Sequence, residues 1–156
     1  MIAAALGVQT QLSFPFGHLN ITVVLVYYYG LKTLENDNPR EFHGARLELR
    51  GALFGVLVGL AEDTISGHVL GPYFLSKGLI GFLTPLLFMD VIFKWTPLWA
   101  GIIIAVFTVM DGVIVIGAGM IFSEFNVNTA SAVQETLFQV LLNVPLGMLL
   151  KAGKHD

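Results

Sequence analysis

The fold is decided by residues 98–122, which read LWAGIIIAVFTVMDGVIVIGAGMIF and contain one charged side chain, Asp111. An α-helix rises 1.5 Å per residue, so this stretch would form a helix about 37 Å long. That length exceeds the roughly 30 Å of a membrane's hydrocarbon core. The stretch does not alternate polar and apolar residues, as a strand of a transmembrane barrel does. It therefore predicts a helix that crosses a membrane.

The composition of the whole chain points the same way. Its 156 residues are 55% hydrophobic and 12% charged, with a mean hydropathy of +0.77, whereas a soluble domain has about 25% charged residues. The chain contains no cysteine, so disulfides and thiolate metal sites are excluded. A net charge of −3 without a basic stripe gives no reason to expect a nucleic-acid partner.

Apolar segments divide the chain into about six helices, which predicts an all-α, polytopic membrane bundle forming a single domain over residues 1–156. Pro85 interrupts the fourth segment, and a kink is expected there because proline removes a backbone donor. If the short first segment is not a helix of the bundle, five helices remain, and the N-terminus is predicted on the outer side of the membrane. The predicted segments are 1–14, 20–34, 51–65, 73–93, 98–122 and 130–151.

The basic residues predict the orientation of the bundle. With six alternating helices, seven of the eight Lys and Arg residues fall on one side, and the eighth is Lys77 in the fourth segment. Because positive loops stay in the cytoplasm, both termini are predicted to be cytoplasmic and the chain to be a multi-pass protein of the inner membrane. The seven residues are Lys32, Arg40, Arg46, Arg50, Lys94, Lys151 and Lys154.

Glycines recur every fourth residue in the third segment, at Gly51, Gly55 and Gly59, and Asp63, Gly67 and Gly71 continue the same spacing. Residues four apart share one face of a helix, and small residues let two helices approach closely in lipid. We expect the stripe to form a packing groove within the chain. A groove for a partner protein is the alternative.

Four ionisable residues fall at or near membrane depth: Glu62, Asp63, Lys77 and Asp111. Charged residues in the membrane are costly and often functional. We expect a buried polar clamp, with Asp63 and Lys77 paired across the turn between the third and fourth segments, in preference to a substrate or proton path. Adjacent Glu62 and Asp63 point to different faces of a helix and need separate partners.

The sixth segment adds Gln139 and Asn143, which we expect to form hydrogen bonds between helices. No hydrolase, zinc-protease or phosphate-loop motif is present. The histidines are isolated, without the spacing of a metal site. The sequence therefore predicts no enzyme, no catalytic residue, no metal and no cofactor.

The third and fourth segments resemble the rod shape-determining protein MreD family. The strong match covers residues 51–84, and the last segment is similar to the family's final helix through Asn143-Val144-Pro145. Lys77 and Glu62 depart from the family pattern, which has a small or apolar residue and no extra charge at these places. The matching residues are Gly55, Gly59, Leu60, Asp63, Gly67, Leu70, Gly71, Leu75, Leu79 and Leu83.

The resemblance implies a non-enzymatic membrane scaffold of the bacterial cell-elongation and peptidoglycan-synthesis complex. Its partners would be an MreC-like membrane protein and, through it, an MreB-like actin and the wall-synthesis enzymes. The implied fold is similar to the substrate-binding subunit of energy-coupling-factor vitamin transporters. Such a subunit is the alternative function, docking through the small residues at 3–7. A proton-coupled carrier using Asp63 and Asp111 is a third reading, but the sequence lacks the repeats common in such folds.

Overall fold

The computed structural model describes residues 20–36, 45–66, 71–88, 96–122 and 129–150. These residues are all-helical and contain no strand, which confirms the predicted fold class at this level. The predicted first segment, 1–14, lies outside the described residues. The helices are α2 (Ile21–Asn36), α3 (Ala45–Ser66), α4 (Pro72–Leu86), α5 (Pro97–Phe122) and α6 (Thr129–Leu149).

The observed helices do not all begin where the predicted apolar segments begin. α5 begins one residue before the predicted segment, whereas α3 begins at Ala45, six residues before the predicted start at Gly51. This added start of α3 contains Arg46, Glu48 and Arg50 in sequence. Leu47 within it is 2% exposed, whereas Leu49 is 58% exposed and Arg50 is also exposed.

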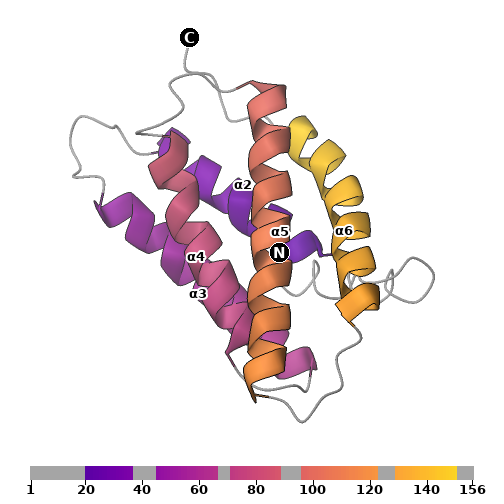
Figure 1. Ribbon diagram of the computed structural model, residues 1–156. Helices are drawn as coiled ribbons and strands as arrows, with labels where there is room; N and C mark the ends of the chain where they lie inside the picture. The colour runs from indigo at the N-terminus through magenta and orange to yellow at the C-terminus, as the bar shows by residue number, and fades with distance from the viewer. Residues whose placement is uncertain (1–19, 37–44, 67–70, 89–95, 123–128, 151–156) are drawn as a thin grey trace.

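α2 is the central helix of the described bundle, because it packs against each of the other four described helices. The closest pairs are α3 with α4 and α5 with α6. Figure 1 shows α3 and α4 lying side by side on one side of α5, with α6 running along the other side. The apolar core of the bundle includes Val26 and Tyr27 of α2, Ile80 of α4 and Phe107 of α5.

The α3–α4 contact depends on the predicted glycine stripe. A Cβ atom at Gly55 would lie 2.0 Å from the carbonyl oxygen of Lys77, and one at Gly59 would lie 2.3 Å from that of Tyr73. At Gly51 the same atom would lie 2.1 Å from the carbonyl oxygen of Gly81. Any side chain would therefore meet backbone, which has no rotamer to move away. Packing within the chain accounts for these three glycines.

Gly71 does not belong to this stripe, contrary to the prediction. It precedes α4 with a φ of +134°, and a Cβ atom there would meet nothing within 4 Å. Glycine is favoured at this position because side chains disfavour that backbone conformation. Gly67, the other predicted member near the turn, lies outside the described residues.

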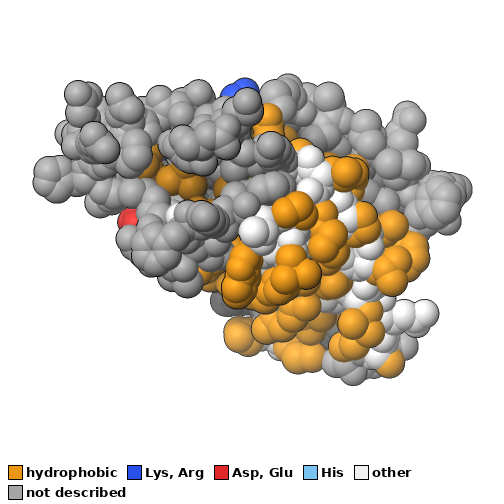
Figure 2. Space-filling view, turned by 90° about the horizontal axis from the view of Figure 1, so that it is seen from above, with side chains coloured by type: hydrophobic (Ala, Val, Ile, Leu, Met, Phe, Trp, Pro, Cys, Tyr) orange, Lys and Arg blue, Asp and Glu red, His pale blue; other side chains and the backbone are white. Residues whose placement is uncertain are grey.

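The distribution of polarity is inverted relative to a water-soluble bundle. Glu62, Asp63, Lys77 and Asp111 are all buried, while many leucines, isoleucines and valines are exposed. Hydrophobic side chains cover much of the described surface in Figure 2, and charged ones are visible only at its edges. By length and composition, one described helix, over Pro97–Ala118, is able to cross a membrane.

Candidate functional site

All five described helices contribute to a set of buried polar side chains that we call the central polar cluster. Each helix supplies at least one residue, and every member is at most 6% exposed. Burial of this kind is costly unless the polar groups bind one another. The members are Asn20, which immediately precedes α2, Thr22, Glu62, Ser76, Lys77, Thr108, Asp111 and Asn143.

An ion pair between α4 and α5 lies at the centre of the cluster. The Nζ atom of Lys77 is 2.6 Å from Oδ1 of Asp111, and the lysine side chain is fully buried. Nζ also lies 3.4 Å from Oε2 of Glu62 on α3. The ammonium is 5.2 Å from the centre of the Tyr73 ring, one turn earlier on α4, which adds a cation–π contact.

Asp111 receives more hydrogen bonds than the lysine alone provides. Asn20 donates its side-chain amide to Oδ2 of Asp111, and the Ser76 hydroxyl donates to Oδ1. With Lys77, the carboxylate therefore accepts from three donors on two other elements. An ionised carboxylate is an acceptor only and has room for all three. These contacts hold α5 against α4 and the start of α2.

Asn143 connects α6 to the rest of the cluster. Its Nδ2 atom donates to the backbone carbonyl of Asn20 and to the Thr108 hydroxyl, both at 3.2 Å. The Thr108 hydroxyl donates in turn to the carbonyl of Ile104 one helical turn earlier. The predicted interhelical role of Asn143 thus has definite partners, while Gln139 is half-buried and takes part in none of these hydrogen bonds.

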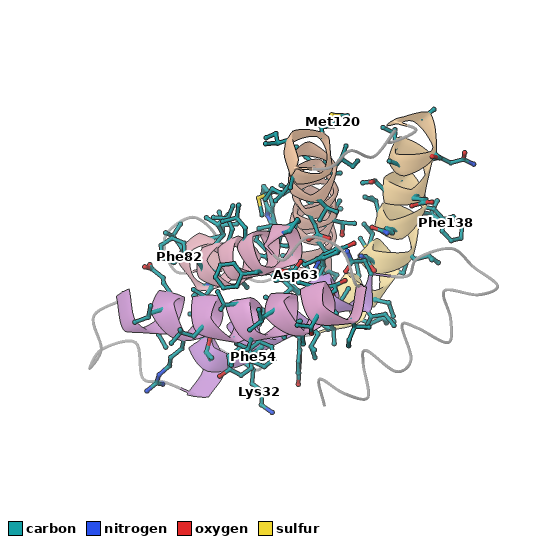
Figure 3. The ribbon with its side chains drawn as sticks, turned by 90° about the horizontal axis from the view of Figure 1, so that it is seen from below. Lys32, Phe54, Asp63, Phe82, Met120 and Phe138 are labelled. Carbon is teal, nitrogen blue, oxygen red and sulfur yellow. The ribbon has the colours of Figure 1, made fainter. Side chains whose placement is uncertain are left out.

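Asp63 has a different role from the one predicted. Its carboxylate accepts hydrogen bonds from the backbone N–H groups of Gly71 at 3.0 Å, Tyr73 at 3.1 Å and Phe74 at 3.0 Å. These are donors at the start of α4, which have no partner within their own helix, and the helix dipole favours a negative charge there. In Figure 3, Asp63 lies where α3 and α4 meet, whereas Lys32 and Phe138 point away from the bundle.

The predicted Asp63–Lys77 clamp is therefore corrected. A clamp exists, but the ion pairs of Lys77 are with Asp111 and Glu62. Lys77 lies beyond the first turn of α4 on its inner face, whereas Asp63 binds the turn itself. The expectation that adjacent Glu62 and Asp63 need separate partners agrees with these contacts.

We expect Asp63→Ala to lower the free energy of unfolding by about 2 kcal/mol, because three partly buried backbone donors lose their acceptor. The measurement is reversible unfolding in mixed detergent micelles. The matched control is Glu135→Ala on α6, whose side chain is exposed, and which should change stability by less than about 0.5 kcal/mol. Equal stability of the two variants would contradict the capping role.

Four members of the cluster were missed from the sequence: Asn20, Thr22, Ser76 and Thr108. Asn20 and Thr22 stand at the start of the predicted segment 20–34, where polar residues are expected, so neither indicated a buried site. A signal was present for Thr108, which precedes Asp111 by three residues and so shares its helix face. Ser76 adjoins Lys77 in the sequence and gave no such signal.

The chemistry available to the cluster is hydrogen bonding and charge pairing. In the part of the chain that the structure describes, no group of three His, Cys, Asp or Glu side chains could hold a metal ion. In comparisons with known proteins, no family model, no curated protein and no solved structure matches this chain. The site is therefore interpreted from its own geometry.

Proposed function

We propose that this chain is a multi-pass inner-membrane protein of about six helices with cytoplasmic termini. We further propose that it acts as a non-enzymatic scaffold of the cell-elongation complex, as the resemblance to the MreD family implies. The observation that carries the membrane part of the proposal is the inverted polarity of the bundle. Four charged side chains, Glu62, Asp63, Lys77 and Asp111, are buried, while many large apolar side chains are exposed.

The outer face of α3 illustrates this inversion. Leu53, Leu57 and Leu60 are 54%, 60% and 44% exposed, and the opposite face carries the glycines that contact α4. A contiguous apolar surface of this kind marks an interaction with lipid or with another protein. In lipid, exposed leucines carry no penalty, and charged side chains face the interior of the bundle, where they can pair.

The lengths of α3 and α6 suit a bilayer. α3 has 22 residues and α6 has 21, which correspond to about 33 and 31 Å of helix. The charges of α3 gather at its two ends, with Arg46, Glu48 and Arg50 before the apolar stretch and Glu62 and Asp63 after it. This arrangement supports a helix with one end at each side of the membrane.

Support for the scaffold comes from what the motif residues do. Four of the positions on which the MreD resemblance rests build one structural unit: Gly55 and Gly59 bring α3 against α4, Gly71 supplies the backbone turn, and Asp63 caps α4. Each of these roles is structural, and none exposes a reactive group. A motif that shapes a helical hairpin fits a protein that presents surfaces to partners.

The partner experiment uses the tagged full-length chain, expressed in its native membrane and solubilised in mild detergent. We expect an MreC-like protein with a single membrane span to copurify, and depletion of the chain to turn rod-shaped cells round. An untagged strain and an equally abundant, unrelated multi-pass protein are the controls. Recovery of an energising ATPase with a bound vitamin would contradict the scaffold and favour a transporter substrate subunit.

A further inference from the structure

The two faces of α6 differ in what they contact. The inner face packs closely against α5. A Cβ atom at Gly112 of α5 would lie 2.7 Å from Oγ1 of Thr136, and one at Gly147 of α6 would lie 2.2 Å from Cδ1 of Ile104. Among the described helices, α6 contacts mainly α5 and, to a smaller extent, α2. Its other side therefore faces the surroundings of the bundle.

The exposed side of α6 combines apolar residues with two polar ones. Phe138 and Leu141 are 42% and 68% exposed, and Figure 3 shows Phe138 pointing away from the bundle. Gln134 and Glu135, one turn earlier, are exposed as well. Residues three or four apart share a face of a helix, so these four side chains form one surface, which we call the α6 outer face.

The packing against α5 fixes the depth of Glu135. It precedes Thr136, whose hydroxyl lies beside Gly112. Gly112 is 15 residues after Pro97 and six residues before Ala118, which are the ends of the stretch that is able to cross a membrane. Those separations correspond to about 22 Å and 9 Å of helix. In a bilayer crossed by α5, Glu135 therefore lies well inside the span and not at its surface.

A carboxylate at that depth is poorly matched to lipid. Charged residues in membrane helices almost always face the interior of the bundle or pair with one another. Glu135 faces outward and forms no hydrogen bond or ion pair with the described residues. The outer face of α3, by contrast, presents leucines over the same kind of apolar helix. The α6 outer face therefore requires a neighbour that brings a positive charge.

A second copy of the chain does not supply that charge. Two copies related by a two-fold axis along the membrane normal present the same patch to each other, which places their Glu135 carboxylates at one depth, where they repel. Of the described basic residues, Lys77 is buried in its own ion pairs. Lys32, Arg46 and Arg50 are at least ten residues, or about 15 Å of helix, from the members of the central polar cluster on their own helices. Asp111 of that cluster adjoins Gly112, which marks the depth of Glu135.

We propose that the α6 outer face docks a membrane-spanning helix of another protein, and that this helix carries a lysine or arginine at the depth of Glu135. Phe138 and Leu141 pack against its apolar side chains. Glu135 pairs with the basic group, and Gln134 adds a hydrogen bond beside it. Each charge then has its counter-ion within the membrane. This inference rests on the proposed membrane scaffold and adds the place where its partner binds.

The first test is photo-crosslinking in the native membrane, using the full-length chain with a photoreactive residue at position 141. Position 57 on the exposed face of α3 is the matched control, since Leu57 and Leu141 are 60% and 68% exposed. Position 141 should crosslink to a membrane span of another protein, and mass spectrometry should find a lysine or arginine within that span. Position 57 should not crosslink to it.

The second test measures how much of the crosslinked partner copurifies with Glu135→Gln. Recovery should fall at least about tenfold, because a shielded charge pair loses one member. Glu48→Gln on α3 is the matched control and should keep wild-type recovery. Glu135→Lys should also lose the partner, and exchanging the partner's basic residue for glutamate should restore binding to it. Unfolding of the purified variants should match wild type, because Glu135 is exposed in the chain alone.

The outcomes separate the docking face from the scaffold function. An MreC-like protein that copurifies equally with Glu135→Gln and crosslinks through position 57 would overturn the docking face and leave the scaffold in place. A protein unrelated to MreC, captured through position 141 and rescued by the charge exchange, would support the docking face and contradict the scaffold. Crosslinks from position 141 to lipid alone or to a second copy of the chain, or a failed charge exchange, would overturn the inference.

Discussion

Gly55→Ala is expected to destabilise the protein by about 2–3 kcal/mol, although it adds a single methyl group. The new Cβ atom would lie 2.0 Å from the carbonyl oxygen of Lys77 and 2.6 Å from its carbonyl carbon. Because both atoms are backbone, the two helices must separate. Overpacking usually costs about 1–3 kcal/mol, and here the displaced residue is also the one that pairs with Asp111.

Gly117→Ala on α5 is the matched control for this experiment. A Cβ atom at Gly117 would have no neighbour within 4 Å, and alanine is the better helix former by about 1 kcal/mol. This variant should be as stable as wild type or slightly more stable. Both are measured by reversible unfolding in mixed micelles, followed by circular dichroism. Equal stabilities would show that α3 and α4 are less closely packed than the structure shows.

Lys77→Met is expected to cost about 3–5 kcal/mol, the loss typical of removing one member of a buried ion pair. Methionine fills a similar volume but leaves the Asp111 carboxylate without the donor at 2.6 Å. The unpaired carboxylate must then remain charged in the interior or take up a proton. Lys32→Met on α2 changes an exposed lysine and should alter stability by less than about 0.5 kcal/mol.

The double variant Lys77→Met/Asp111→Asn separates charge pairing from packing. It removes both charges of the pair, and replacing a buried pair by neutral groups is often close to neutral in stability. Most of the loss seen in Lys77→Met should therefore be recovered. If the double variant is as unstable as the sum of the two single variants, the residues are not energetically coupled.

Much of the helical framework was predictable because it depends on one-dimensional patterns. The apolar stretch 98–122 agrees with α5 to within one residue, and the stripe through Gly51, Gly55 and Gly59 predicts a close helix contact from its spacing alone. Both signals are periodic along a single helix. The six-span count and the orientation stay predictions, since the structure describes five helices and one span by length and composition.

The partners within the cluster were not predictable, because they depend on how helices cross. Nearness in the sequence favoured Asp63 for Lys77, but Asp63 is occupied by the amides that open α4. α5 then brings in Asp111 from 34 residues further along the chain. Asn20, which joins Asp111 to Asn143, precedes the first described helix and lies 91 residues from Asp111. No spacing rule relates residues so far apart.

The separation between Lys77 and Asp111 bears on the biosynthesis of the protein. At about 5–20 residues per second, the ribosome makes the 34 residues that lead from Lys77 to Asp111 in roughly two to seven seconds. During that interval Glu62, already synthesised on α3, is the carboxylate of the pair available to the nascent lysine. The contact between Lys77 and Glu62 is therefore the one that α3 and α4 can form by themselves, and the contact with Asp111 is added once α5 has been made.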